Sequence, residues 1–414
     1  MLSHHPIFVI FLAAVAAPLL AQTRAGARMP VVVFELLLGV LIGPQVMRLI
    51  EYDSFLSVMR TVGMVAVLFM AGMEMDFERI RGRPLSLAVR GWIASALLAG
   101  LVVAVLHAIP GVRAPAIVII ALTTTGLGTL LPILRDGGLL EQPFGKMLLA
   151  AGTLGEVGPI VAVSLVLSDR YSTWQEFGFL LVFLGLVALA AAVGVGVRPP
   201  KVLGLLSRTM HTSTQLPVRF ALLILAALVV VSDLFGFEAV FGGFAAGMIV
   251  GLATRGTDGE AFRVKIDAVC FGWFAPFFYV GTGVAFDVGA LGRDVTTMLL
   301  LPSFLLLFLV ARGLPTLLYR RDLSRQELLP FAFSSGVASL GLVVVITHVG
   351  LQTKHMNPDI AQALVGAAVL SLLVYPTLAR MLLSRAATIG GGVGLGGLAQ
   401  AGRKQEGIDH GSKS

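Results

Sequence analysis

The sequence predicts an all-α protein that crosses a membrane many times, and its composition and the spacing of its apolar runs both indicate this class. Of its 414 residues, 57% are hydrophobic and 13% are charged, and the mean hydropathy is +0.92. Apolar runs of roughly 20 residues, the length that one helical crossing of a bilayer requires, recur from end to end. A soluble protein with one buried core lacks this pattern, so we predict a polytopic membrane protein.

The apolar runs define about thirteen candidate transmembrane helices. We interpret the first as a retained helix and not a secretory signal, because residues 1–6 carry no Lys or Arg while Arg24 and Arg28 follow it. We expect residues 1–385 to form the membrane domain and the polar, glycine-rich residues 386–414 to form a disordered cytoplasmic tail. The spans lie at roughly 5–20, 30–44, 55–74, 86–107, 115–134, 144–168, 176–197, 217–232, 239–254, 268–286, 297–318, 327–350 and 361–383.

Basic residues predict how the chain is oriented in the membrane. The net charge is +7, but the basic residues form short clusters between spans, which indicates membrane topology and not nucleic-acid binding. By the positive-inside rule we expect an inner-membrane protein with its N-terminus outside and its C-terminus in the cytoplasm. The clusters in alternate loops are Arg24 and Arg28; Arg79, Arg81 and Arg83; Arg135; Arg198, Lys201 and Arg208; Arg255, Arg263 and Lys265; and Arg320, Arg321 and Arg325.

Glu156 is an acid near the middle of an apolar run, residues 144–168. A charged residue at the centre of a membrane helix costs about 2.5 to 3.5 kcal/mol even on lenient insertion scales, so such an acid normally has a function and a partner. A proton-binding or cation-binding site and a purely structural ion pair are both open interpretations. The expected partner is Arg312, eight residues inside the membrane from Arg320, although its side chain could instead reach the inner surface.

Two apolar spans contain weak helical segments at matching places, residues 123–128 in span five and 334–341 in span twelve. Glycines and clustered hydroxyls inside a span mark places where the backbone can unwind, provided that the freed groups find partners. Two such segments in two six-span halves, with span seven as a linker, indicate an inverted-repeat transporter; for either segment alone, close packing of small residues is the alternative. The residues concerned are Thr123, Thr124, Thr125, Gly126 and Gly128 in one segment and Ser335, Gly336 and Ser339 in the other.

Four motifs add a family resemblance. They are ELLLGVLIGP at 35–44, LFMAGMEMD at 68–76, FGGFAAG at 241–247 and PFFYVGTG at 276–283. With these motifs the chain resembles the sodium/proton exchanger superfamily over residues 5–385, in particular the cation:proton antiporter-2 family that includes potassium-efflux antiporters. The resemblance implies a core domain in which spans five and twelve cross as half-unwound helices. It also implies a dimerisation domain, an elevator-like cycle and exchange of protons for monovalent cations by a homodimer.

The resemblance also implies site residues. The family's ion-binding aspartate lies on span six, usually after Asn, Asp or Gln, and the most natural alignment places Gly155-Glu156 there. This is a departure, because glutamate is one methylene longer and glycine removes the neighbouring ligand or second acid. A second alignment makes Glu156 a structural acid and leaves Val161 at the place of the aspartate.

Several other polar residues could support the ion site. The oxygens of Thr123 to Thr125 could bind a dehydrated cation, although threonines in membrane helices often bond back to their own backbone. Arg312 lies in span eleven, where the family usually carries Lys or Arg. Glu35 is either a second supporting charge or an interfacial acid near Arg24 or Arg28.

Together these observations predict an antiporter that exchanges H⁺ for Na⁺ or K⁺. We expect electroneutral exchange, because the site has one candidate acid and an arginine that does not release its proton. The alternatives are a transport-inactive sensor or scaffold, suggested by the missing Asn-Asp pair, and a channel-like K⁺ efflux protein. The sequence has no Walker loop, no HExxH pair and no nucleophile elbow with a credible histidine partner, so we expect neither an enzyme nor a cofactor.

Overall fold

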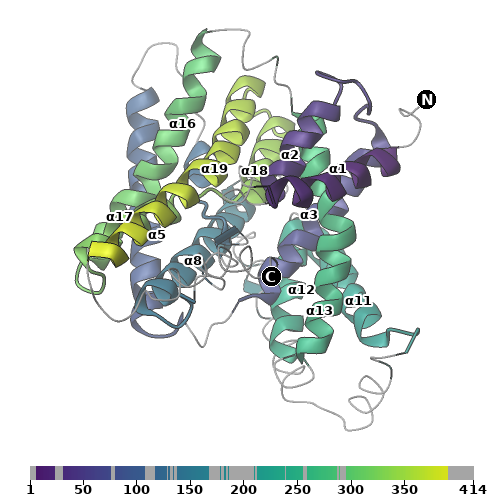
Figure 1. Cartoon of the computed structure of the whole chain (residues 1–414), viewed down its shortest axis with the longest axis horizontal. Coiled ribbons are helices and arrows are strands. Elements are labelled where there is room, and N and C mark those ends of the chain that lie inside the picture. Colours follow the sequence, from purple (N-terminus) through teal and green to yellow (C-terminus); the bar gives the residue numbers. More distant parts are fainter. Residues whose placement is uncertain are drawn as a thin grey trace, which may run out of the picture. The chain divides into compact units, whose positions relative to one another are not determined.

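The structure is a computed structural model of the chain, and the residues that it describes are entirely helical outside turns and loops (Figure 1). Most of predicted span seven, Gly128 and residues 390–414 lie outside the described residues. The structure describes residues 6–23, 31–75, 80–107, 117–127, 129–130, 134, 138–166, 178, 181–182, 185, 209, 212–237, 239–254, 259–286, 289 and 295–389.

The chain forms two compact units, and each combines segments from both halves of the sequence. Unit 1 consists of residues 1–75 and 162–289, and unit 2 consists of residues 76–161 and 290–414. Unit 1 therefore contains predicted spans one to three and eight to ten, whereas unit 2 contains spans four to six and eleven to thirteen. Each unit takes three spans from each predicted repeat.

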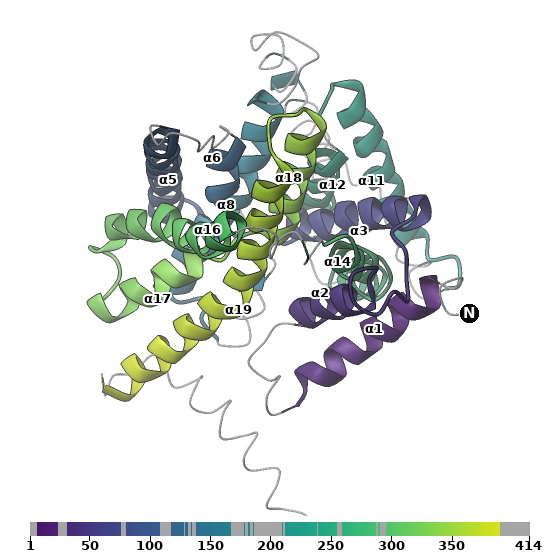
Figure 2. The ribbon, with the colours of Figure 1, turned by 90° about the horizontal axis from the view of Figure 1, so that it is seen from above.

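Unit 1 is held together by glycines that let helix backbones approach closely. A Cβ at Gly247 would lie 1.9 Å from the Phe69 carbonyl oxygen, and one at Gly283 would lie 2.1 Å from that of Leu36. Figure 2 shows α14 lying between α2 and α3, with both of which it packs. Several motif glycines are therefore packing residues. The helices are α1 (Pro6–Ala21), α2 (Val31–Ile42), α3 (Ser54–Met73), α11 (Leu216–Leu234), α12 (Ala239–Ala253), α13 (Gly259–Val269), the π-helical η2 (Cys270–Phe274) and α14 (Ala275–Ala285).

Unit 2 is organised around α19, which packs against α16, α17 and α18 (Figure 2). Helix α16 continues directly into the 3₁₀ turn η3, and α17 begins with a capping box formed by Ser324 and Glu327. Helix α19 ends at Ile389, so it continues past residue 385, where the membrane domain was expected to end. The helices are α5 (Arg83–His107), α6 (Ile117–Leu122), α8 (Pro143–Val166, mostly in this unit), α16 (Val295–Gly313), η3 (Leu314–Tyr319), α17 (Arg325–Ser335), α18 (Leu340–Gln352) and α19 (Pro358–Ile389).

Two helices of unit 2 are interrupted at the segments predicted to unwind. Helix α6 ends at Leu122, and residues 123–126 are not helical. Helix α17 ends at Ser335, α18 begins at Leu340, and the two are bent by 42° relative to each other. The predicted discontinuity of spans five and twelve is confirmed.

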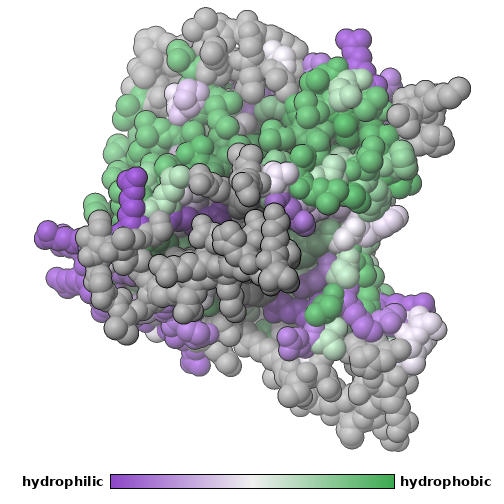
Figure 3. Space-filling view, viewed as in Figure 1, coloured by the Kyte–Doolittle hydropathy of each residue, from purple (hydrophilic) through white to green (hydrophobic). Residues whose placement is uncertain are grey.

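The described helices suit a lipid environment. Seven are long and apolar enough to cross a membrane, eight if the bent pair α17 and α18 is one span, and α1, α2 and α12 are shorter apolar helices. Every predicted span except the seventh contains a described helix. Their outer surface is apolar: Leu97 and Leu299, for example, are 71% and 61% exposed. Figure 3 shows hydrophilic side chains near the end where α17 begins. The chain is a polytopic, all-α membrane protein.

The close contact at Gly247 can be tested by substitution. We expect Gly247→Leu to lower the free energy of unfolding of the detergent-solubilised protein by about 1–3 kcal/mol or more, and with it the melting temperature. The reason is that the new side chain must displace the α3 backbone at Phe69. The matched control is Gly272→Leu, since a Cβ at Gly272 has no heavy atom within 4 Å. Equal melting temperatures for the two variants would contradict the close packing of α3 and α12.

Candidate functional site

The two helix interruptions meet inside unit 2. The N–H of Gly126 donates to the carbonyl oxygen of Val337 at 2.8 Å, which joins one interruption to the other. A Cβ at Gly126 would lie 2.8 Å from the Ala338 carbonyl oxygen, so the contact requires glycine. Gly336, by contrast, is the C-cap of α17 and would place a Cβ 3.3 Å from its nearest neighbour. The predicted meeting of spans five and twelve is thus present, with Gly126 as its tightest point.

Three consecutive N–H groups, two in the first interruption and one on the residue that follows it, each have a partner on another element. The N–H of Thr125 donates to the Gly155 carbonyl at 2.9 Å, that of Gly126 donates to the second interruption, and that of Leu127 donates to Glu156 Oε1 at 3.0 Å. Buried backbone groups without such partners would cost free energy comparable to a lost hydrogen bond each. Helix α8 therefore stabilises the unwound segment at two adjacent points, once through its backbone and once through a carboxylate.

Local sequence explains why α8 can accept these bonds. Pro159 has no N–H, so it cannot donate to the carbonyl four residues earlier, which is that of Gly155. This carbonyl is then available to Thr125. Glycine at 155 is needed as well, because a Cβ there would lie 2.5 Å from Thr125 Cβ and 2.8 Å from its Oγ1. The segment Gly155 to Pro159 thus provides both the acceptor and the space for Thr125.

The three threonines of the first interruption have different contacts. The hydroxyls of Thr123 and Thr124 donate back to the carbonyls of Ile120 and Ala121, each at 2.8 Å, as threonines often do at helix ends. The Thr125 hydroxyl instead donates to the Ser335 carbonyl at 2.8 Å. Only Thr125 of the three therefore links the two interruptions through its side chain.

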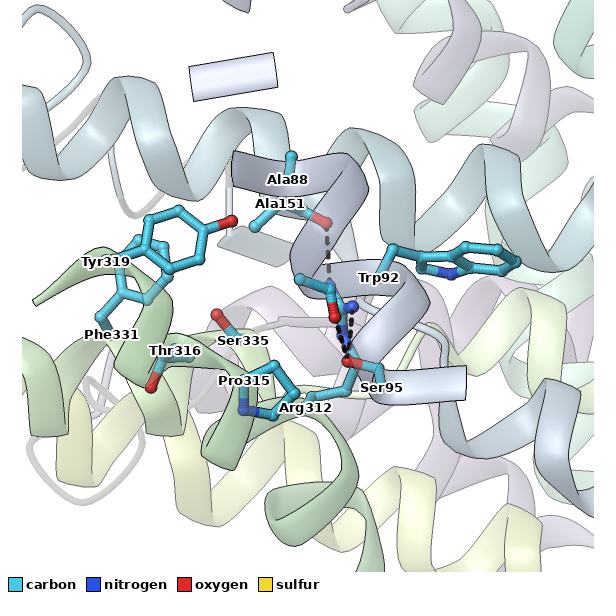
Figure 4. Close-up of a pocket in the computed structure, with 11 residues that line it drawn as sticks. Ala88, Trp92, Ser95, Ala151, Arg312, Pro315, Thr316, Tyr319, Phe331 and Ser335 are labelled. Carbon is cyan, nitrogen blue, oxygen red and sulfur yellow. Dashed lines mark hydrogen bonds between the residues drawn. The ribbon is translucent and has the colours of Figure 1, made fainter. Parts of the chain in front are cut away.

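Arg312 completes this arrangement from α16. It is 4% exposed, so it does not extend to the membrane surface. Its Nε donates to Thr125 Oγ1 at 2.7 Å. Its Nη1 donates to Ser95 Oγ at 3.3 Å and its Nη2 to the Ala151 carbonyl at 2.9 Å (Figure 4). The guanidinium thus holds the interruption, α5 and α8 together.

Arg312 is the expected partner of Glu156, but the structure shows no direct contact between the two side chains. No ion pair among the described residues joins them, and Arg312 reaches the neighbourhood of Glu156 through Thr125 and Ala151. The physical reason is that the unwound segment lies between the two groups: Thr125 accepts from Arg312 while Leu127, two residues later, donates to Glu156. Glu156 itself is 3% exposed.

Two supporting hydroxyls were missed by sequence reasoning. Ser95 on α5 accepts from Arg312, and Ser371 on α19 accepts from the Ala338 N–H at 3.0 Å. Both are fully buried. A signal was present, because each is a hydroxyl within an otherwise apolar span, but serines that bond only to their own helix have the same sequence pattern.

The remaining predicted residues lie on three different helices. Ser339 is buried at the N-cap of α18, and Val161 is half-buried on α8. Glu35 is 8% exposed on α2 of unit 1, so it is not a solvated interfacial acid and it is not among the residues that unit 2 brings together. No group of three or more His, Cys, Asp or Glu side chains that could hold a metal ion occurs in the described part of the chain.

The role of Gly155 gives a test that depends on the geometry alone. We expect Gly155→Ala to separate Thr125 from α8 and to raise the amide hydrogen exchange of residues 123–127 about 5- to 10-fold, because a backbone bond of roughly 1 kcal/mol is lost. Gly100→Ala in the same unit is the control, since its Cβ would have its nearest neighbour at 4.0 Å. Unchanged exchange in Gly155→Ala would rule out this close contact.

Comparison with known proteins agrees with this architecture. The chain is 23% identical to the putative Na(+)/H(+) antiporter YjbQ of Bacillus subtilis over 91% of its own length and 62% of that protein. It thus spans less than two thirds of this relative. It is 24% identical to the Na(+)/H(+)-K(+) antiporter GerN of Bacillus cereus, over 84% of this chain and 88% of GerN.

A solved structure shares the fold. It is that of the sodium proton antiporter MjNhaP1 from Methanocaldococcus jannaschii at pH 8, with a TM-score of 0.62 and 20% identity over 94% of this chain and 98% of that one. The profile of one family, described as "Sodium/hydrogen exchanger, transmembrane", matches residues 9–385. With nearly the whole membrane domain matched and both helix interruptions in place, the chain belongs to the transmembrane sodium/hydrogen exchanger family.

Proposed function

We propose that this chain is a secondary antiporter that exchanges protons for monovalent cations, Na⁺ or K⁺, and that Glu156 binds both in competition. The observation that carries the proposal is the position of Glu156. It is a buried carboxylate that contacts the unwound segment where two interrupted helices meet. In transporters with inverted repeats, such discontinuous helices bind the substrate or coupling ion. The names of the relatives YjbQ and GerN, both antiporters, support the same activity.

The hydroxyl oxygens of the first interruption suit a dehydrated monovalent cation, which takes oxygen ligands. Thr123 and Thr124 each use their hydroxyl hydrogen to bond their own helix, which leaves the oxygen lone pairs available. Thr125 is different, because its Oγ1 accepts an N–H from the cationic Arg312. We therefore assign Thr123 and Thr124 as candidate ligands with Glu156, and Thr125 as a positioning residue.

Arg312 supplies a fixed positive charge that takes no part in proton transfer. Its guanidinium stays protonated, and its three described hydrogen bonds go to neutral oxygens. Among the described residues of unit 2, Glu156 and Arg312 are the buried charged side chains. One carboxylate that alternates between a proton and a cation moves one positive charge in each direction, which makes the exchange electroneutral.

We assign different roles in transport to the two units. Unit 2 holds the site and corresponds to a moving core, and unit 1, with its backbone contacts at Gly247 and Gly283, corresponds to a dimerisation domain. In this proposal two copies of residues 1–385 form a homodimer in the inner membrane. The N-terminus lies outside, residues 386–414 lie in the cytoplasm, and the core moves as an elevator.

Substituting Glu156 tests the proposed activity. We expect Glu156→Gln to abolish Na⁺- or K⁺-dependent proton flux in liposomes without loss of folded protein, because an amide binds neither a proton nor a cation in exchange. Glu156→Asp should keep partial activity with a changed cation preference. The matched control is Glu35→Gln, the other described buried acid, which lies in unit 1 and should keep the flux.

The same assay distinguishes other activities. Wild-type flux in Glu156→Gln would make Glu156 a purely structural acid. A wild-type protein without flux would favour the sensor or scaffold, and cation flux without proton movement would favour a channel.

Stoichiometry can be measured separately. We expect the antiport rate in liposomes to stay unchanged when the membrane potential is clamped at several values with an ionophore suited to the cation, because one buried acid serves both ions. A rate that rises steeply with potential, or net charge movement on a solid-supported membrane, would reveal a second titrating group. Glu35→Gln would then show whether Glu35 is that group.

A further inference from the structure

A small cavity lies beside Arg312, where α16 continues into η3. It is lined by residues of α5, α8, α16, η3 and α17, among them Gly91, Arg312, Thr316, Tyr319 and Ser335 (Figure 4). Its volume is about 10 Å³. That is roughly the space that the centre of a single buried water needs, and such a water binds stably only with two to four polar partners.

The cavity contains polar groups with hydrogen-bonding capacity to spare. Ser335 Oγ is buried and has no hydrogen-bond partner among the described residues, although the Ser335 carbonyl accepts from Thr125. Arg312 has five N–H groups, and three of its hydrogen bonds are described. The Tyr319 side chain is 2% exposed, and Figure 4 shows its hydroxyl and that of Ser335 pointing into the cavity.

The direction of the Tyr319 hydroxyl is fixed by aromatic packing. The Tyr319 ring lies against Phe331 with ring centroids 4.7 Å apart, and Phe331 packs edge-on against Phe144 at 5.6 Å. On its other side the hydroxyl lies next to Gly91, where a Cβ would be 3.4 Å away. The Tyr319 ring is therefore held in place by packed neighbours.

We propose that this cavity binds one ordered water molecule that accepts a hydrogen bond from Arg312 and bridges Tyr319 Oη and Ser335 Oγ. Three partners match the usual number for a buried water. A chloride ion would also suit the donors, but it is larger than water, and the cavity has room for the centre of about one water-sized sphere. A cation is excluded by the adjacent guanidinium. The water connects η3 to the last residue of α17, next to the point where the two interruptions meet.

A double-mutant cycle tests this bridge by thermal unfolding. We expect Ser335→Ala and Tyr319→Phe each to lower the melting temperature, by roughly 2–4 °C if each loses one hydrogen bond. The double variant should lose clearly less than the sum of the two shifts, because one water serves both hydroxyls. The control pair is Thr316→Val with Tyr319→Phe: Thr316 lines the same cavity, but its hydroxyl donates to Gly313, so these shifts should add.

Several outcomes would overturn the proposal. One is additive shifts for Ser335→Ala and Tyr319→Phe. Another is a higher melting temperature in Ser335→Ala, which is expected if the hydroxyl is buried without any partner. A third is stabilisation of the wild-type protein by chloride relative to gluconate at equal ionic strength that disappears in Ser335→Ala, because it would assign the cavity to an anion.

A direct measurement does not depend on variants. In a cryo-electron microscopy map of the wild-type protein that shows ordered waters elsewhere in unit 2, we expect a density peak within hydrogen-bonding distance of both Tyr319 Oη and Ser335 Oγ. A map of that quality without the peak would refute the bound water.

Discussion

The structure of unit 2 depends on satisfying the backbone of residues 123–126, which leave the helical conformation within an apolar span. In a bilayer no water compensates a freed N–H, so every donor needs a partner supplied by the protein. The N–H of Thr125 finds its partner on α8, and that of Gly126 finds it at the interruption between α17 and α18. Glu156 of α8 also accepts from Leu127, the first residue after the unwound segment. Arg312 then fixes the segment through Thr125. The proposed ion site is a consequence of this solution, because the same contacts bring Glu156 to the unwound segment.

The glycine at position 155, which the family resemblance marks as a departure, has a structural reason in this chain. A side chain at this position would collide with Thr125, whose N–H and hydroxyl both hold the interruption. Thr125 thus occupies the space that a side chain at position 155 would need. The longer side chain of Glu156 is compatible with this glycine, since its carboxylate reaches the N–H of Leu127. Glycine at 155 and glutamate at 156 therefore belong to one local arrangement.

Much of this arrangement followed from sequence, because its signals are local. Glycines and hydroxyls inside apolar runs indicated both interruptions, and the cost of burying charge singled out Glu156 and Arg312. Side-chain contacts were not predictable in the same way: Arg312, the expected partner of Glu156, instead contacts Thr125, Ser95 and Ala151. One of these acceptors is a backbone carbonyl, which every residue has, so no residue type in the sequence marks it. Likewise, nothing local distinguishes Thr125 from its two neighbours.

The long separation between bonded partners has a consequence for biogenesis. Thr125 bonds to a carbonyl 210 residues later in the chain, and both units are built from segments that are synthesised far apart. While the ribosome is still making the second half, the first interruption is already in the membrane without its Ser335 and Val337 acceptors. The nascent chain must therefore keep these groups hydrated, keep them helical or shield them within the insertion machinery until α17 arrives. Premature release of a truncated chain would leave unsatisfied backbone in the lipid, a feature that membrane quality control could recognise.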